Sequence, residues 1–175
     1  MELEQLRYPI GKFMPPAHFT EGVKNEYINV ISSAPTLLKE LINEFTTEQW
    51  LTTYREGGWN ATQVVNHLAD SHMNGFVKFK IGLTEDSPIF KSYDELKWSM
   101  LADGNIMPPE ASFRILEGLH HRWVVLLENM SMDDFNKTIR RPQTNEKVSL
   151  GHNLAIYAWH VKHHLAHLEI IKNKG

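Results

Sequence analysis

Residues 159–167 read WHVKHHLAH and place four histidines within eight positions. Apolar residues recur at helical spacing from Leu150 to Leu168, so we predict an amphipathic helix through this stretch. Residues four apart lie one above the other on a helix, and two imidazoles on one face can therefore bind the same metal ion. The stretch predicts both the last helix of the fold and a metal site on it.

Two histidine pairs in this stretch have the four-residue spacing, His160/His164 and His163/His167. At about 100° per residue, the first pair projects within about 100° of the centre of the apolar stripe, whereas the second projects about 120° or more away from it. Metal sites in helical bundles are built inward, from side chains on facing helices. We therefore predict that the first pair binds a metal and that the second pair lies on the surface.

The composition is that of a soluble globular protein. The chain has 175 residues, of which 42% are hydrophobic and 22% charged, so we predict one domain spanning residues 1–175. The net charge of -3 gives no broad basic field, and we expect no nucleic-acid partner. There is no cysteine, so any metal must be bound through nitrogen and oxygen. The sequence shows no apolar signal core and no run long enough to span a membrane, and we expect a cytoplasmic protein without membrane contact.

The first part of the chain is predicted to form an arm and a long helix. Residues 1–19 contain three prolines, which do not fit inside helices, so this segment is expected to be an extended arm packed over the domain. A helical pattern follows over residues 20–45. Pro35 lies in the middle of it, and we expect this proline to kink or split the helix.

A further histidine pair lies on a helix predicted over residues 61–83. Asn60, with Gln63 three residues later, forms the capping-box signature that opens it. Within this helix His72 projects closer to the apolar stripe, while His67 lies on its flank, about 110° from the centre. Two ligands make a weak metal site, and either histidine could supply the third. Periodicity alone leaves the choice open.

Two more helices complete the predicted architecture. Pro109 is acceptable in a first helical turn and opens a third helix that runs to Leu127. Residues 137–148 alternate in polarity around turn residues and predict a small β-hairpin, after which Ser149 can cap the histidine-rich helix. Four long helices with long crossover loops predict an all-α fold, a four-helix bundle.

Several short motifs, taken together, are similar to those of a known family. They are GWN at residues 58–60, VVNHLADSH at 64–72, LTED at 83–86 and AIYAWHVKHH at 155–164. These motifs resemble the DinB-like metalloprotein superfamily, and within it the YfiT-type metal-dependent hydrolases of bacilli. The resemblance spans nearly the whole chain.

The resemblance implies a four-helix bundle with a three-histidine metal site. His67 would be the ligand from the second long helix, and His160 and His164 the ligands from the last. One divalent ion would be bound per subunit. Zinc is our first choice by availability, and nickel is the alternative, since imidazole ligands alone do not separate them.

The resemblance also implies a homodimer. Ile156, Trp159 and Ile170 form a second apolar stripe on the last helix, on the side away from the bundle core. Such a stripe usually needs a cover. A second subunit or the arm at residues 1–19 could provide it, and the sequence favours neither.

Three protein ligands leave coordination positions open for water or substrate, as in catalytic metal sites. Both hydrolysis and thiol transfer fit such a site, and the resemblance to the YfiT-type hydrolases implies a metal-dependent hydrolase that acts on a small molecule. Some relatives in the superfamily transfer low-molecular-weight thiols, which makes a bacillithiol-type thiol S-transferase the alternative. A stress or sensor protein that binds metal without turnover is a third class, and it predicts a filled coordination sphere or no substrate-sized cavity.

The sequence does not identify a general acid or base. Asp70 lies one turn beyond His67 and is a candidate for a base, for a residue that orients an imidazole, or for a solvent-facing residue. Further candidates are Glu26, Glu169 and Tyr157.

Overall fold

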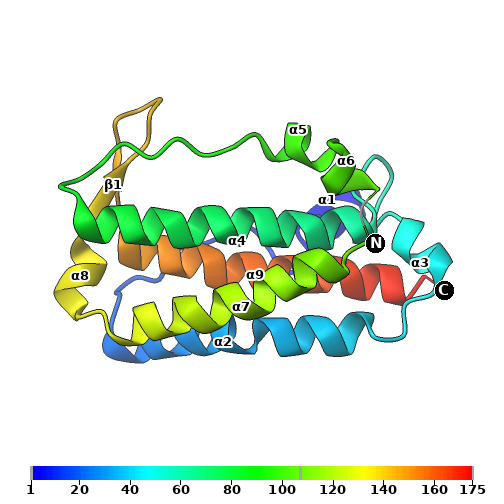
Figure 1. Ribbon diagram of the computed structural model, residues 1–175, viewed down its shortest axis with the longest axis horizontal. Coiled ribbons are helices and arrows are strands. Elements are labelled where there is room, and N and C mark those ends of the chain that lie inside the picture. The colour runs from blue at the N-terminus through cyan, green and yellow to red at the C-terminus, as the bar shows by residue number, and fades with distance from the viewer. Residues whose placement is uncertain (1, 107, 175) are drawn as a thin grey trace.

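The computed structural model describes residues 2–106 and 108–174, and in this part of the chain four long helices pack side by side (Figure 1). They are α2 (Glu21–Ile42), α4 (Ala61–Thr84), α7 (Glu110–Glu128) and α9 (Leu150–Lys172). Long segments connect them, most visibly between α4 and α7 (Figure 1). The predicted four-helix bundle with long crossovers is confirmed.

Within the described residues, seven short elements accompany the four long helices, most of them near the two ends of the bundle (Figure 1). They are α1 (Leu3–Arg7), α3 (Thr47–Leu51), α5 (Glu95–Ser99), α6 (Ala102–Asn105), α8 (Met132–Asn136), β1 (Thr138–Arg140) and β2 (Lys147–Ser149). The strands pair antiparallel, with Ile139 opposite Val148, so the predicted hairpin is confirmed. The hairpin and α8 lie at one end of the bundle, and α3, α5 and α6 lie at the other (Figure 1).

Local capping fixes where the two histidine-bearing helices begin. At the start of α4 the Asn60 side chain accepts from the Gln63 amide at 2.8 Å, and the Gln63 side chain accepts from the Asn60 amide at 3.2 Å. At the start of α9 the Ser149 hydroxyl accepts from the His152 amide at 3.1 Å. Each such cap stabilises its helix by about 1 kcal/mol. Both predicted helix starts are confirmed.

Pro35 does not split α2, so of the two expected outcomes the split is wrong and the kink stays a prediction. The helix continues from Glu21 through Pro35 to Ile42. Because proline has no N–H, it cannot donate to the carbonyl of Ile31 four residues earlier. Nδ1 of His120 on α7 donates to this carbonyl instead, at 2.6 Å. The bond lost inside α2 is thus replaced by a bond between α2 and α7.

Close approach of three helices shapes the middle of the core. At Gly75 of α4, a Cβ would lie 2.6 Å from the ring of Tyr157 on α9 and 2.7 Å from the ring of Trp123 on α7. Only glycine leaves room for both aromatic rings at this separation. Trp123 is fully buried, and its ring lies edge-on to that of Tyr157 with centroids 5.1 Å apart. This packing brings α4 against α9, the two helices that carry the predicted ligands.

The N-terminal segment packs along α9. Leu3–Arg7 forms a short helix, which corrects the prediction of a wholly extended arm; this helix ends before the first proline. Beyond it, the carbonyl of Gly11 accepts from Nε1 of Trp159 at 3.2 Å, and Phe13 lies edge-on to the same indole. The arm therefore covers Trp159 in the second apolar stripe.

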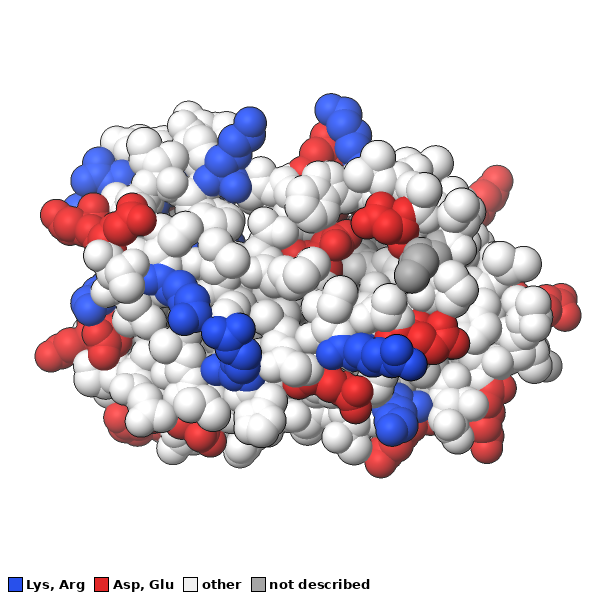
Figure 2. All heavy atoms as spheres, in the orientation of Figure 1, with Lys and Arg blue, Asp and Glu red and all other residues white. Residues whose placement is uncertain are grey.

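The surface carries charges of both signs. On the face shown in Figure 2, lysine and arginine side chains are interspersed with aspartate and glutamate over the whole visible area. Among the described residues, none of the helices is long and apolar enough to span a membrane.

Candidate metal centre

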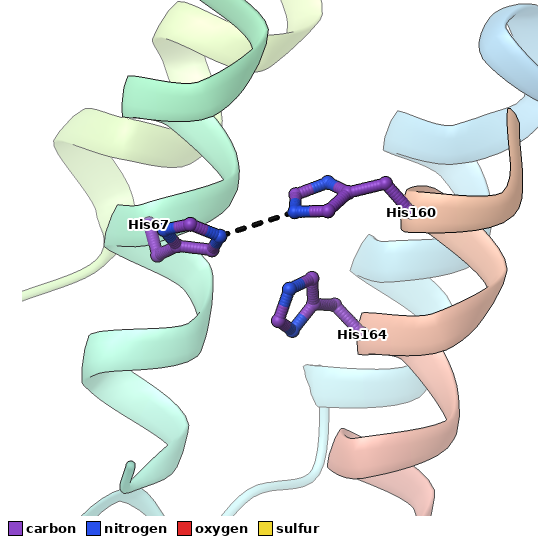
Figure 3. Close-up of side chains that lie close together, drawn as sticks. All are labelled: His67, His160 and His164. Carbon is purple, nitrogen blue, oxygen red and sulfur yellow. Dashed lines mark hydrogen bonds between the residues drawn. The ribbon is translucent and has the colours of Figure 1, made fainter. Parts of the chain in front are cut away.

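Three histidines from two facing helices meet beside the middle of the bundle. His67 comes from α4, and His160 and His164 come from successive turns of α9. One ring nitrogen from each lies within 4.8 Å of the others. In Figure 3 the three rings point into the space between the helices. The structure thus brings together the three residues predicted as metal ligands.

The spacing and chemistry of these rings fit a divalent ion. Nε2 of His67 and Nε2 of His160 lie 3.1 Å apart, joined by the dashed line in Figure 3. Two nitrogens bound to one tetrahedral zinc at about 2.0–2.1 Å would be about 3.3–3.4 Å apart. Burial lowers the pKa of His67 to about 4 and holds the pKa of His160 and His164 well below the usual range. The rings are therefore neutral near pH 7, which is the form that binds a metal.

The other nitrogen of each of these rings contacts a neighbouring side chain. Partners of this kind orient metal-binding imidazoles and tune their basicity. The contacts run from Nδ1 of His67 to the hydroxyl of Tyr93 at 3.2 Å, from Nδ1 of His160 to Nε2 of His72 at 3.3 Å, and from Nδ1 of His164 to Nδ1 of His167 at 3.4 Å.

The second histidine pair of α9 is buried, and the prediction that it lies on the surface is wrong. His163 is 8% exposed and His167 only 1%. The ring of His163 stacks on Trp159 with centroids 4.4 Å apart, and that of His167 stacks on Tyr54 at 3.8 Å. The helical projection predicted burial only for the face of α9 that packs against the other long helices. It contains no information on the N-terminal arm and the segment around Tyr54, which cover the opposite face.

His164 belongs to a second group of histidines as well. Ring nitrogens of His163, His164 and His167 also lie within 4.8 Å of one another. All three come from neighbouring turns of one helix, whereas bundle metal sites usually combine facing helices. Nε2 of His167 also donates to the carbonyl of Arg7 at 3.3 Å. The first group, which joins α4 to α9, is the better candidate for a metal centre.

The first group opens onto a cavity of about 360 Å³. Trp59 forms one wall, with its ring centroid 4.5 Å from that of His67. Tyr93, whose hydroxyl contacts Nδ1 of His67, and Ser71 also line the cavity. Two cationic side chains, Arg7 and Arg55, also line the cavity. The remaining lining residues are Tyr8, Tyr54, Ser92, Glu95, Trp159, His160, His163, His164 and His167.

One of these arginines carries an unpaired donor. Nη1 of Arg55 donates to the carbonyl of Glu56 at 2.8 Å, but its buried Nε has no hydrogen-bond partner among the described residues. Buried donors without partners are uncommon in native proteins. Arg55 is therefore a candidate for contact with a bound ligand.

The predicted acid–base candidates do not line this cavity. Asp70 is half-buried, and burial together with the nearby charge of Asp103 raises its pKa to about 6. Glu26 and Glu169 are exposed. Tyr157 is buried, with its hydroxyl 3.5 Å from Nζ of Lys78. Of these four side chains, Tyr157 alone contacts one of the three histidines: its ring lies edge-on to that of His160, with centroids 6.4 Å apart.

Three residues around the site were not predicted from the sequence. His120 falls on the core face of α7, four residues after Leu116 and three before Trp123, and this position was the available signal. Tyr93 lies in the crossover between α4 and α7, and Arg55 lies between α3 and α4. No periodic pattern marks residues in such segments.

A three-histidine cluster with two buried rings and one half-buried ring, open to a cavity in a four-helix bundle, is typical of helical metalloproteins. The chain belongs to the DinB superfamily, whose model matches residues 31–168. A protein of Bacillus subtilis named "Putative metal-dependent hydrolase YfiT" is 40% identical over 97% of this chain and 96% of its own length. A similarly named protein of Oceanobacillus iheyensis is 45% identical over 93% of both chains.

Comparison with solved structures leads to the same group of proteins. A solved structure of YfiT from Bacillus subtilis, described as "a probable metal-dependent hydrolase with an unusual four-helix bundle topology", superposes with a TM-score of 0.93. That match is 39% identical and covers 97% of each chain. The predicted membership of the YfiT-type group is confirmed.

Proposed function

We propose that the protein is a metal-dependent hydrolase with one divalent ion at His67, His160 and His164, zinc first and nickel as the alternative. The observation that carries this proposal is the meeting of three neutral imidazoles from facing helices at a cavity of about 360 Å³. Three protein ligands leave positions open for a substrate, and the cavity gives the substrate access to them.

The ion, when bound, would lower the pKa of a water molecule and polarise an oxygen of the substrate. The side chains of this protein position the reactants. Trp59 covers one side of His67, and Tyr93 contacts the outer nitrogen of the same ring. Burial raises the pKa of Tyr93 above its usual range, so its hydroxyl stays protonated and can donate to an oxygen in the cavity.

The cavity favours an anionic small molecule. Arg7 and Arg55 line it, against the single carboxylate of Glu95. The histidine side chains are neutral near pH 7, so the lining is net positive before any metal is bound. Guanidinium groups bind carboxylates and phosphates with paired hydrogen bonds. A substrate with such a group is therefore part of the proposal.

Thiol S-transfer, with a bacillithiol-type thiol as second substrate, is the alternative reaction at the same site. An anionic thiol would suit the same positive lining. The sensor class is disfavoured, because it predicts a filled coordination sphere or no substrate-sized cavity. A cavity of this volume beside the histidines supports an enzyme.

We also propose that the protein is a homodimer in the cytoplasm. The stripe at Trp159 no longer supports a dimer, since the N-terminal arm covers it. A different apolar surface does, on α5, α6 and the residues that follow each. Its exposed side chains are Leu96, Met100, Leu101 and Ile106. Light scattering after size-exclusion chromatography would measure the mass in solution.

The test is a turnover assay on metal-reconstituted protein. Hydrolysis of ester and amide substrates is compared, in parallel, with conjugation of bacillithiol to an electrophile. We expect thiol-independent hydrolysis that His67→Ala abolishes and that the exposed-site control His121→Ala retains. Thiol-dependent conjugation alone would replace the hydrolase by the transferase. Stoichiometric metal binding without either activity would favour the sensor class.

A further inference from the structure

A line of polar contacts crosses the bundle behind the metal centre and touches all four long helices. It begins at the carbonyl of Ile31 on α2, which accepts from Nδ1 of His120 on α7 at 2.6 Å. Nε2 of His120 lies 2.7 Å from Nδ1 of His72 on α4, and Nε2 of His72 lies 3.3 Å from Nδ1 of His160 on α9. Each ring therefore uses both of its nitrogens.

The carbonyl at one end fixes the direction of every bond in this line. A carbonyl oxygen can only accept, so Nδ1 of His120 carries its proton. A neutral imidazole has one N–H, so Nε2 of His120 accepts, and the proton of the second bond lies on Nδ1 of His72. By the same step Nε2 of His72 accepts from Nδ1 of His160. Nε2 of His160 is then left with a lone pair, and this is the atom that faces His67.

The rings in this line are held neutral by burial. His72 is 1% exposed and His120 is 2% exposed. Desolvation is the main cause that lowers the pKa of both rings, and their mutual proximity lowers that of His72 further. A proton added to either ring would also turn an acceptor into a second donor facing another N–H. The geometry and the burial agree on one arrangement of protons.

Pro35 explains why the carbonyl of Ile31 is available. In an uninterrupted helix this oxygen accepts from the amide of the residue four positions later. That residue is Pro35, which has no N–H, and the oxygen is left for another donor. A proline in the middle of α2 costs helix stability, but here it leaves an acceptor pointing into the core where His120 can reach it.

We propose that His72 and His120 are positioning residues that hold His160 in the tautomer with Nε2 free to bind the metal, and that the Pro35-released carbonyl of Ile31 sets this tautomer. The proposal rests on the proposed metal site. His164 has a parallel arrangement, because the carbonyl of Arg7 accepts from His167, whose other nitrogen faces Nδ1 of His164. Outer partners of this kind typically change metal affinity by about 10–100-fold when removed.

The test compares two replacements of His120, which contacts neither the metal nor a proposed ligand. His120→Leu removes both the donor and the acceptor. His120→Gln can keep both, since its amide can donate to the carbonyl of Ile31 and its oxygen can accept from His72. His121→Leu on the exposed side of the same helix is the matched control. The probes are zinc, titrated against a competing chelator, and nitrogen NMR of the histidine rings in the metal-free full-length protein.

We expect the metal-free wild-type protein to show His160 protonated on Nδ1. His120→Leu should mix the tautomers of His160 and weaken zinc binding by about 10–100-fold, while His120→Gln and His121→Leu should stay within a few-fold of wild type. Protonation of wild-type His160 on Nε2, or unchanged zinc affinity in His120→Leu, would overturn the proposal. If His120→Leu does not fold, the wild-type tautomer and His120→Gln decide. Failure of zinc to bind wild type would instead overturn the proposed function, and the tautomer would still be readable.

Discussion

The two histidine pairs of α9 have the same spacing, but they face different parts of the molecule. His160 and His164 face α4, where Nε2 of His67 lies 3.1 Å from Nε2 of His160. His163 and His167 also line the cavity, but their rings pack against the N-terminal arm and Tyr54, with aromatic rings and the backbone of Arg7 as partners. The two pairs therefore lie in different environments, one with a third imidazole from a facing helix and one with aromatic packing and a backbone carbonyl.

The comparison teaches that spacing within one helix does not determine what a histidine pair does. A pair becomes a metal site when a third ligand arrives from another helix and the outer nitrogens have partners. It becomes part of the core when aromatic rings cover it. In this protein α4 supplies the first condition and the N-terminal arm contributes to the second.

The largest expected effect is on metal binding. We expect His160→Ala or His164→Ala to abolish stoichiometric zinc binding, and His163→Ala to retain it, because only the first two face His67. Isothermal titration with zinc measures the stoichiometry and the dissociation constant. Equal losses in His163→Ala and His164→Ala would show that the two faces of the helix are not distinct in the way described.

We expect His167 to contribute to the stability of the fold. His167→Ala removes a ring that is 1% exposed, stacks on Tyr54 and donates to the carbonyl of Arg7. The loss of packing and of a buried hydrogen bond should lower the free energy of unfolding of the metal-free protein by about 2–4 kcal/mol. Urea denaturation measures it, with the exposed-site variant His18→Ala as control. A stability equal to wild type would mean that this face is not packed as described.

Acid should destabilise the metal-free protein through buried histidines of both α4 and α9. Burial lowers the pKa of His67 and of His167 to about 4, whereas an unfolded histidine has a pKa of about 6.5. Between these values the unfolded chain binds more protons, so the free energy of unfolding falls as the pH drops from about 6.5 to about 4. Asp70 opposes this over part of the range, since burial raises its pKa to about 6.

Urea denaturation at pH 7, 6 and 5 measures this slope without metal. The histidine contribution should be fully present above pH 6.5 and decline below it. A free energy of unfolding that stays constant over this range would contradict the burial of the histidines. In His167→Ala the slope should be smaller than in wild type, because one of the buried rings is gone.

Substrate affinity should depend on the cationic side of the cavity. We expect Arg55→Gln to raise KM for an anionic substrate about 10-fold, the effect of losing one charge-assisted hydrogen bond, with kcat nearly unchanged. Arg114→Gln on the exposed face of α7 is the matched control. Steady-state kinetics on an anionic and a neutral substrate of the same class would test it. An equal rise in KM for both substrates would contradict a role for charge.

The smallest expected effect concerns the packing of the N-terminal arm on α9. Trp159→Phe keeps most of the ring but removes the bond from Nε1 to the carbonyl of Gly11. We expect a loss of about 1 kcal/mol in the free energy of unfolding, with zinc affinity unchanged. Protease sensitivity of residues 8–13 should rise in parallel. A drop in zinc affinity of more than a few-fold would contradict the expectation that the face of α9 covered by the arm and the face that carries the proposed metal ligands act independently.

The sequence predicted those parts of the fold that local signals determine. The reciprocal cap of Asn60 and Gln63, and the cap at Ser149, lie within four residues of the helix starts they specify. The inward direction of His160 and His164 also followed from one helix alone. In the site, the choice of His67 over His72 came from family resemblance, since both lie on buried turns of α4.

Long-range contacts account for what the sequence could not predict. The burial of His163 and His167 depends on residues near the start of the chain, such as Tyr8 and Arg7, which lie about 150 positions away. The role of Pro35 in α2 depends on a histidine of α7 that reaches the freed carbonyl. Helical periodicity describes one helix at a time, and it contains no information on which partner covers each face.

The most direct test of the account is a zinc-edge anomalous diffraction measurement on crystals of the full-length protein grown with zinc. We predict one peak per chain, within bonding distance of the imidazoles of His67, His160 and His164 and open toward the cavity. A peak held by His163 and His167, or occupancy only at surface histidines such as His121, would contradict the central claim that α4 and α9 together form the metal centre.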